Sequence, residues 1–375
     1  MSKVSSKNKV GTSAFMSKFF KSNKDFHYNY EECADSYLVS TGSMILDQCM
    51  GGGLSSGLQR FIGCNEGGKT NEALHVMLNM LDTVENTKGL YIKAEGRLSK
   101  AIQERSGLKF VQDPEKWDVG TCLVWDCNIY DTVFDGLREL LKNNPDKERF
   151  CIVIDSMDGL LSKGDLEKST SEAAKVAAGA TLTSDFLKRV SLGMSRFGHM
   201  CIMVSQVRST IKTSQYAASD PNNQTNSSGG NAALHYPDWI INFEKRNQAD
   251  LIVQDPKARP SPENKIIGHY AKVHIQKSTN ESTGLRIRYP IKYARSGGKS
   301  IWIEREIIEM LLMWSYIEKA GSWFKIDPEI VAFLSEKGFD IKEKYQGMNS
   351  LYSLLEEDEG LTDALKGFVR DNILS

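Results

Sequence analysis

The sequence predicts an α/β protein with a mostly parallel central sheet flanked by helices, and three observations support this prediction. From residue 58 onward, short apolar runs alternate with helical stretches. The apolar runs, such as FCIVIDS at 150–156, are nearly continuous, which is typical of parallel strands buried on both faces. A glycine-rich turn joins the first run to the helix that follows it. Together these features indicate strand–helix–strand units that share one sheet.

The strands and helices of this core follow from the hydrophobic pattern. Strands are expected at 58–63, 89–95, 121–127, 150–156 and 201–207, and helices at 69–81, 98–107, 132–144 and 181–197. Three further β-rich runs are expected to extend the sheet with antiparallel strands, at 238–245, 269–277 and 284–293. Two polar stretches interrupt the pattern, at 162–180 and 209–230, and long loops of this kind are usually functional or disordered.

The two ends of the chain differ from this core. Residues 1–38 are expected to form an N-terminal arm with a short amphipathic helix, SAFMSKFF, whose phenylalanines share a face. A helix this short is marginal in water, so that face needs either the protein's own core or a neighbouring subunit to pack on. The segment SGGKS marks a boundary, after which residues 297–375 are expected to form a small, mostly helical C-terminal domain. The core then spans 39–296.

Composition and charge limit the class of protein. Of 375 residues, 40% are hydrophobic and 25% are charged, which is ordinary for a globular protein and unlike disordered or collagen-like chains. No run approaches the roughly 18 apolar residues of a transmembrane helix, and no secretory signal is expected. The formal net charge is −1, so a polyanion would have to be bound by a local patch. Seven scattered cysteines are expected to be buried and reduced, which favours a cytoplasmic protein with no membrane partner.

The segment GCNEGGKT at 63–70 fits the pattern G-x-x-x-x-G-K-[ST] between an apolar strand and a helix. Glycines let consecutive backbone N–H groups surround an anion, and the helix N-terminus adds the positive end of its dipole. Lys69 would supply a positive charge to the β- and γ-phosphates of ATP, and the Thr70 hydroxyl would ligate Mg²⁺. The nucleotide-binding candidates are therefore Gly63, Cys64, Asn65, Glu66, Gly67, Gly68, Lys69, Thr70 and Asn71. The alternative is a glycine turn before an ordinary helix.

Two acidic residues end strands of the expected sheet. Asp155 ends CIVID and is a candidate Mg²⁺ residue beside Thr70, although many strands end in an aspartate that only caps a helix. Hydrolysis also needs a group that positions the attacking water. Glu95 ends GLYIKAE, and in a parallel sheet that end opens on the same side as the glycine-rich loop. The alternative for Glu95 is a carboxylate that is merely solvated.

Taken in order, these residues resemble the RecA/UvsX family of ATP-dependent DNA recombinases. STGSMILDQCMGGGL at 40–54 resembles the segment that leads into that family's P-loop, and KAEG at 93–96 resembles D-A-E-H, whose glutamate activates the water. SQVR at 205–208 resembles N-Q-I-R, GGNAALHY at 229–236 resembles G-G-N-A-L-K-F-Y, and YIEKAGSWF at 316–324 resembles I-E-K-A-G-A-W-Y. The resemblance covers most of the chain and implies a RecA-like P-loop ATPase core.

The resemblance also implies a mechanism. RecA-like proteins polymerise as helical filaments on single-stranded DNA, with ATP between adjacent protomers, and pair that strand with homologous duplex DNA. Gln206 resembles the glutamine that contacts the γ-phosphate and passes its presence to a DNA-binding loop. The candidate catalytic residues are therefore Glu95, Lys69 and Gln206. Lys277 resembles a lysine that reaches the ATP of the neighbouring protomer.

Two segments would be the DNA-binding loops of such a protein. Residues 162–175 would form the first and 207–230 the second, and the candidate DNA contacts are Arg208, Lys212, Gly229, Gly230 and Asn231. Backbone N–H groups, amides and a few basic side chains suit sequence-independent binding. A disordered surface loop fits the composition of 207–230 equally well. A single-strand-binding protein and a loading mediator are further candidate partners, in the bacterial cytoplasm or, for a phage protein, that of the host.

Some residues depart from the family pattern. Asn71 stands where bacterial RecA has a second threonine, and Ile102 and Ser99 stand where bacterial RecA contacts adenine. Together with the divergent ends, these departures suggest a phage-type or otherwise divergent member. The leading hypothesis is a DNA strand-exchange recombinase whose ATPase depends on single-stranded DNA. The alternatives are another RecA-fold motor, such as a hexameric helicase or a RadA-like branch-migration factor, and a non-catalytic DNA-binding mediator.

Overall fold

The computed structural model describes residues 12–23, 33–96, 98–166, 177–209, 225–227 and 232–374. The helices are α1 (Thr12–Ser22), α2 (Met44–Cys49), α3 (Lys69–Thr83), α4 (Lys100–Ser106), α5 (Tyr130–Lys142), α6 (Lys163–Leu166), α7 (Ala177–Arg196), α8 (Ala232–His235), α9 (Ile303–Met313), α10 (Pro328–Glu336), α11 (Met348–Glu357) and α12 (Glu359–Asn372). The strands are β1 (Gly57–Gly63), β2 (Thr87–Lys93), β3 (Phe110–Val111), β4 (Cys122–Asp126), β5 (Arg149–Asp155), β6 (Met200–Ser209), β7 (Thr225–Ser227), β8 (Trp239–Phe243), β9 (Leu251–Val253), β10 (Ile266–Lys277), β11 (Arg286–Lys292), β12 (Ile317–Ala320), β13 (Trp323–Ile326) and β14 (Lys344–Gln346). The strands and helices expected for the core are therefore present, with ends shifted by a few residues.

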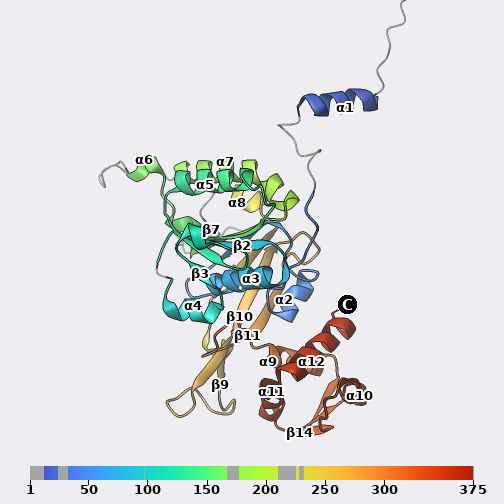
Figure 1. The fold of residues 1–375 in the computed structure, drawn as a ribbon. Coiled ribbons are helices and arrows are strands. Elements are labelled where there is room, and N and C mark those ends of the chain that lie inside the picture. The colour runs from blue at the N-terminus through green and yellow to red at the C-terminus, as the bar shows by residue number, and fades with distance from the viewer. Residues whose placement is uncertain are drawn as a thin grey trace, which may run out of the picture.

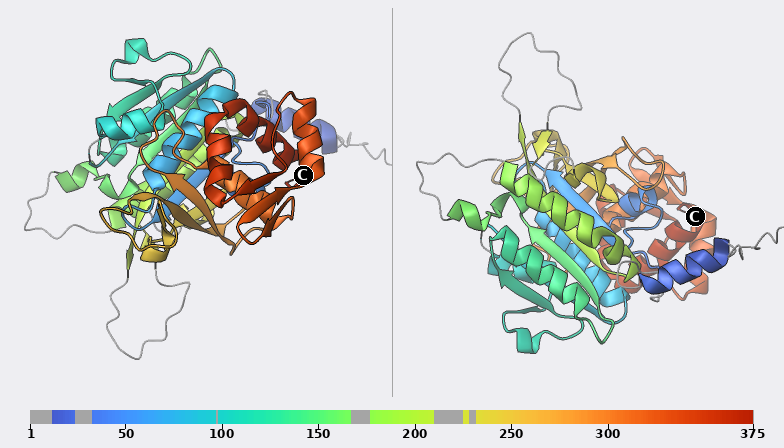
Figure 2. Two further views of the ribbon diagram at one scale, coloured as in Figure 1. Left: turned by 90° about the horizontal axis from the view of Figure 1, so that it is seen from below. Right: turned by 90° about the horizontal axis from the view of Figure 1, so that it is seen from above.

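One large sheet forms the centre of the protein, in the order β11-β10-β8-β1-β6-β5-β2-β4-β3, and its strands from β8 to β3 run parallel. In Figure 1, α5 and α7 lie over one face of this sheet, while α3 and α4 lie over the other. The right-hand view of Figure 2 shows α5 and α7 in front of the strands. The predicted α/β class, with a mostly parallel sheet flanked by helices, is confirmed.

The central strand β1 is buried along its whole length because both of its faces are covered. On one face, apolar side chains of α3 such as Leu74 and Met77 pack against Phe61. On the other face, Leu58 packs in a cluster with side chains of α5 and α7, among them Leu187. Full burial of side chains of this size contributes about 1.5–3 kcal/mol each. The end of β1, from which the glycine-rich loop begins, is thereby held firmly in the middle of the sheet.

The expected antiparallel extension is correct for β10 and β11 and wrong for β8. β8 pairs with β1 in the parallel sense, with Gln59 opposite Trp239, whereas β10 runs antiparallel to β8 and β11 to β10. The reason is the connection that precedes β8. The short helix α8 packs against α7, which covers one face of the sheet. The chain therefore enters β8 at the same end of the sheet at which β1 begins.

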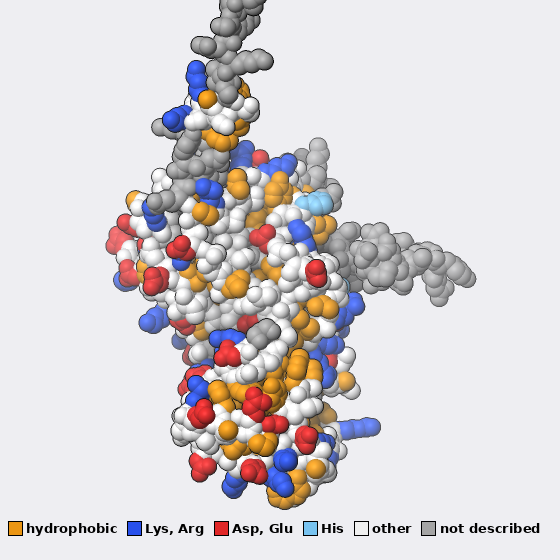
Figure 3. Space-filling model, turned by 90° about the vertical axis from the view of Figure 1, so that its right-hand side faces the viewer, with side chains coloured by type: hydrophobic (Ala, Val, Ile, Leu, Met, Phe, Trp, Pro, Cys, Tyr) orange, Lys and Arg blue, Asp and Glu red, His pale blue; other side chains and the backbone are white. Residues whose placement is uncertain are grey.

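Residues 303–374 pack around an apolar cluster that is separate from the clusters of the large sheet. Met44 of α2 also belongs to this C-terminal cluster. The expectation of a mostly helical segment is incomplete, because β12, β13 and β14 form a three-stranded antiparallel sheet there. Gly321 has φ 64° in the turn between β12 and β13, a conformation that glycine adopts without strain. In Figure 3, hydrophobic side chains gather over the lower part of the molecule, and charges of both signs are intermingled on this face.

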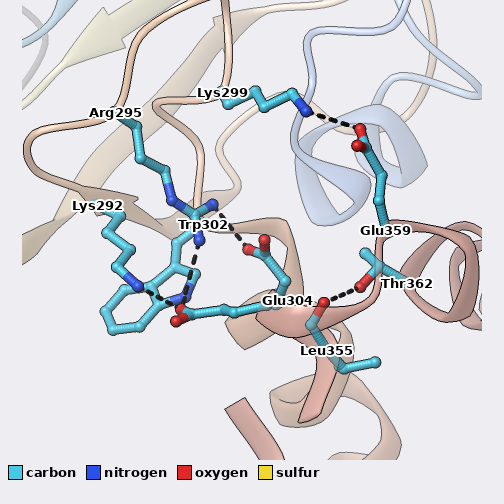
Figure 4. A network of polar contacts seen from close by, with 9 residues as sticks. Lys292, Arg295, Lys299, Trp302, Glu304, Leu355, Glu359 and Thr362 are labelled. Carbon is cyan, nitrogen blue, oxygen red and sulfur yellow. Dashed lines mark hydrogen bonds and ion pairs between the residues drawn. The ribbon is translucent and has the colours of Figure 1, made fainter. Parts of the chain in front are cut away.

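A network of polar contacts joins the large sheet to the C-terminal helices. The carboxylate of Glu356 in α11 accepts hydrogen bonds from the Trp302 indole at 2.7 Å and from Arg295 at 3.4 Å. Arg295 also pairs with Glu304 at 2.8 Å, and Lys299 pairs with Glu359 at 2.7 Å. Figure 4 shows Arg295 directed at Glu304 and Lys299 directed at Glu359. These contacts therefore hold the segment between β11 and α9 against the C-terminal helices α11 and α12.

Glu306 of α9 is buried at the same junction, where it caps α2. Its carboxyl group accepts hydrogen bonds from the Ser43 hydroxyl at 2.6 Å and from the N–H groups of Met44 and Ile45 at 3.1 and 3.2 Å. Desolvation raises the pKa of Glu306 from 4.5 to about 7, although these hydrogen bonds lower it. Because the folded-state pKa lies above the unfolded value, the stability contributed at low pH is lost as the pH rises from 4.5 to about 7.

Replacing Glu306 with glutamine is expected to remove this part of the pH dependence. The free energy of unfolding of the wild type, minus that of E306Q, should fall by on the order of 3 kcal/mol between pH 4.5 and about 7 and then stay level. Urea unfolding at several pH values measures this difference, and Glu318→Gln, at an exposed position of β12, is the matched control. A difference that is the same at every pH would contradict the assignment.

The N-terminal helix and the cysteines complete the description. α1 buries none of its residues, Phe15 and Phe19 are 58% and 49% exposed, and Figure 1 shows α1 apart from the sheet. All seven cysteines are free. Cys122, Cys151 and Cys201 are buried as expected, Cys49 and Cys127 are only partly buried, and the expectation is wrong for Cys33 and Cys64, which are exposed. In the described parts of the chain, no helix is both long enough and apolar enough to cross a membrane.

Candidate nucleotide-binding site

The glycine-rich loop follows β1 at the carboxyl end of the parallel strands, next to the ends of β6 and β8. Gly63 has φ 141°, and a Cβ atom there would lie 2.2 Å from the carbonyl oxygen of Phe243, so only glycine fits. Gly68 has φ 103° just before α3, and a Cβ atom there would meet nothing within 4 Å. The loop is thus packed tightly on its β8 side and open in front of the helix N-terminus, where an anion would be bound.

Lys69 holds its ammonium group over this loop. Its Nζ atom donates hydrogen bonds to the carbonyl oxygens of Gly63 at 3.0 Å and Cys64 at 2.7 Å, and the side chain is buried. Desolvation lowers the pKa of Lys69, and the nearby carboxyl group of Asp155 opposes that effect. A buried ammonium group beside the N-terminus of a long helix is suited to bind phosphate oxygens.

Thr70 and Asp155 form the candidate Mg²⁺ site. The Thr70 hydroxyl donates to Asp155 Oδ2 at 2.7 Å, and the Tyr91 hydroxyl donates to the same atom at 2.8 Å. Desolvation raises the pKa of Asp155, and both hydroxyl contacts lower it. Among the described residues, no group of three or more His, Cys, Asp or Glu side chains is arranged to hold a metal ion. A hydroxyl and one carboxylate nevertheless fit Mg²⁺, which completes its shell with phosphate oxygens and water.

Glu95 and Gln206 are in direct contact at the same edge of the sheet. The Gln206 side-chain amide donates to Glu95 Oε1 at 2.9 Å, and the Ser156 hydroxyl donates to that atom at 2.6 Å. Glu95 lies just beyond β2 and is exposed, so it can reach a water molecule. The backbone N–H of Gln206 donates to Asp158 Oδ2 at 2.6 Å. Three neighbouring strands, β2, β5 and β6, therefore join their ends through one carboxylate.

The next two residues of α3 contact β11 and the segment that follows it. The Asn71 side-chain amide donates to the Ser300 hydroxyl at 3.1 Å, so it contacts the segment after β11. The hydroxyl of Tyr289, in β11, donates to Glu72 at 2.9 Å, and desolvation raises the pKa of this buried carboxyl group to about 8. Ser300 and Tyr289, which the sequence pattern did not indicate, thus hold the start of α3 in place.

Other candidate residues lie elsewhere. Lys277 pairs in register with Ile240, whereas the loop lies level with Phe243, and its ammonium group donates to the carbonyl oxygens of His235 and Pro237. It is therefore not part of the site formed by its own loop. Arg208 lies in β6, but its side chain and the residues Lys212, Gly229, Gly230 and Asn231 are outside the described part of the chain. The same holds for 167–175 of the first expected DNA loop.

Sequence reasoning missed several residues around the loop. Tyr91 was treated only as part of an apolar strand, yet its hydroxyl holds Asp155. Asp158 follows Asp155 by three residues. A second acidic residue so soon after a buried strand could have indicated that Asp158 also lies at this edge of the sheet, where it contacts Gln206. Arg246, in the basic pair that follows β8, lies 3.9 Å from the Glu66 carboxylate and helps to line an open hollow beside the loop.

The chain is similar to known proteins over most of its length. The chain matches no protein-family model. It is similar to the protein RecA of Chlorobaculum tepidum, at 24% identity over 338 residues, which cover 89% of this chain and 83% of that protein. The protein RecA of Malacoplasma penetrans is 25% identical over 351 residues, which cover 92% and 91% of the two chains. These similarities support a RecA-like family and do not point to a phage-type member.

Proposed function

We propose that this protein is a RecA-type recombinase, a single-stranded-DNA-dependent ATPase that forms helical filaments and pairs the bound strand with homologous duplex DNA. The contact between Glu95 and Gln206 carries this proposal. It joins the candidate water-positioning carboxylate to β6, and the expected second DNA loop continues from that strand. The similarity to RecA proteins over most of the chain supports the same conclusion.

In this proposal, residues of the glycine-rich loop would hold the ATP phosphates. Lys69 would donate to the β- and γ-phosphates in place of the two carbonyl oxygens that it now contacts. Thr70 and Asp155 would hold Mg²⁺, which neutralises charge on the phosphates when bound. Glu95 would accept a hydrogen bond from the attacking water and orient it, while Ser156 and Gln206 keep its carboxylate in place.

Binding of DNA would depend on the segment that follows Gln206. We propose that Arg208, Lys212, Gly229, Gly230 and Asn231 contact the phosphodiester backbone without reading the base sequence. Residues 162–175 would add a second contact, and single-strand-binding and loading proteins would act on the same filament.

Filament assembly would use residues of the N-terminal arm and core. Phe15 and Phe19 on the phenylalanine face of α1 are exposed, and this face would pack on a neighbouring subunit. Lys277 would reach the neighbour's ATP. Residues 39–296 would act as the ATPase core and 297–375 as a C-terminal domain.

Single-stranded DNA is expected to stimulate ATP hydrolysis severalfold or more, and the protein is expected to form joint molecules with homologous duplex DNA. Steady-state hydrolysis with and without DNA, a displacement-loop assay and negative-stain microscopy test this together. Exchanging Gly229–Gly230 for Ala–Ala should abolish joint molecules and spare nucleotide binding. Closed rings that unwind duplex DNA would favour a helicase instead, and DNA binding without hydrolysis would favour a mediator.

A further inference from the structure

Arg60 is a buried arginine in the middle of β1, with an exposed fraction of only 1%. It lies on the same face of the strand as Leu58, which packs in the apolar cluster of α5 and α7. Burying a guanidinium group is costly, and an apolar residue of similar volume often serves packing as well or better. The charge therefore requires an explanation other than filling the core.

The guanidinium group is directed at the chain that returns from the expected second DNA loop. Arg60 Nη1 donates to the carbonyl oxygen of Ala233 at 2.8 Å, and Ala233 is itself buried. Ala233 lies in α8, which begins directly after the segment with Gly229, Gly230 and Asn231. Burial lowers the pKa of Arg60 to about 10, while the carboxylate of Asp158 raises it, so Asp158 attracts this cation.

Asp158 also holds the outgoing end of the same segment. Its Oδ2 atom accepts the backbone N–H of Gln206 at 2.6 Å, next to the contact between the Gln206 side chain and Glu95. Beyond Gln206, β6 pairs with the returning strand β7, with Val207 opposite Ser227. The departure of the segment is thus held by Asp158 through Gln206, and its return is held by the buried Arg60 through Ala233.

We propose that Arg60 is a positioning residue for the proposed DNA-binding segment: together with Asp158 it fixes α8 and the end of β6 relative to the nucleotide site, so that occupation of that site changes DNA affinity. This inference rests on the proposed function. Arg60 touches neither nucleotide nor DNA in this account. It acts through Ala233 at one end of the segment and, with Asp158, through Gln206 at the other.

The test compares Arg60→Met, Arg60→Lys and Asp158→Asn with wild type in the full-length protein. Arg189→Met, at an exposed arginine of α7 paired with Asp185, is the matched control. For each protein, the measurements are the Kd for a fluorescent ATP analogue, the Kd for fluorescent poly-dT with ATP or ADP, and the melting temperature. The decisive quantity is the ratio of the two DNA affinities, because a purely structural role would not change it selectively.

Arg60→Met is expected to weaken DNA binding with ATP by about tenfold, equal to the loss of one charge-assisted hydrogen bond, while the nucleotide Kd stays within about twofold. The ratio of DNA affinities with ATP and ADP should fall toward one. Arg60→Lys should restore part of this ratio. Asp158→Asn should act in the same direction but more weakly, because an amide oxygen still accepts the Gln206 N–H, and it tests the proposal even if Arg60→Met fails to fold.

Two outcomes would overturn the proposal in distinguishable ways. If wild type shows nucleotide-dependent DNA binding and Arg60→Lys and Asp158→Asn keep the wild-type ratio, Arg60 has only a structural role and the proposed function stands. If wild type itself binds no single-stranded DNA with either nucleotide, the proposed function fails, and the role of Arg60 fails with it.

Discussion

Glu95→Gln is expected to lower the rate of ATP hydrolysis by about 10²–10⁴-fold while nucleotide affinity stays within a few-fold of wild type. The amide keeps the size of the side chain and can still contact Ser156 and Gln206, but it cannot accept a proton from the attacking water. Single-turnover hydrolysis separates this chemical step from binding. The variant should still bind single-stranded DNA with ATP, because the nucleotide remains uncleaved.

Glu104→Gln is the matched control for this variant, because Glu104 is an exposed glutamate of the nearby helix α4. It should hydrolyse ATP at the wild-type rate. Hydrolysis by Glu95→Gln at an unchanged rate would show that another group orients the water, and the contact with Gln206 would then have no catalytic consequence.

Lys69→Ala is expected to raise the Kd for ATP by about 10–100-fold and to reduce hydrolysis by about 10²–10³-fold. The variant loses the ammonium group that contacts Gly63 and Cys64 and that would bind the phosphates. Its folding should not suffer, because burial of this cation is unfavourable, as the lowered pKa of Lys69 indicates. The melting temperature without nucleotide is therefore expected to be equal to or above that of wild type.

Equilibrium binding of ATP and thermal unfolding measure the two effects separately. Lys100→Ala, at an exposed lysine in the first turn of α4, is the matched control and should leave both unchanged. If Lys69→Ala instead has a lower melting temperature than wild type and an unchanged Kd for ATP, Lys69 is a structural residue. Its ammonium group would then not contribute to ATP binding.

The parts of the candidate site that depend on local sequence could be predicted from adjacent residues. Gly63, Gly68, Lys69 and Thr70 are close in sequence, and their roles follow from the conformations that glycine permits and from the start of a helix. The ends of buried strands at Glu95 and Asp155 were also readable, since apolar runs that stop at an acid are a local pattern.

Contacts between distant segments could not be read in the same way. Gln206 and Glu95 are separated by 111 positions in the chain, and their hydrogen bond depends on β6, β5 and β2 being neighbours. The resemblance to recombinases gave Gln206 a role, but not this partner. The strand β8 was assigned the wrong direction because direction depends on the path of the preceding connection, which hydrophobic periodicity does not encode.

The amino-acid sequence alone determined the class of fold, the glycine-rich loop between β1 and α3 and the acidic residues at the carboxyl edge, because each depends on periodicity or on a few adjacent residues. The tertiary structure alone decided which polar side chains meet. Tyr91 donates a hydrogen bond to Asp155, Glu72 and Asn71 tie α3 to Tyr289 and Ser300, and Arg60 donates to the carbonyl oxygen of Ala233. The physical reason is that a polar side chain inside a protein satisfies its hydrogen bonds with whatever the fold brings near it, and that neighbour is set by strand order rather than by sequence distance.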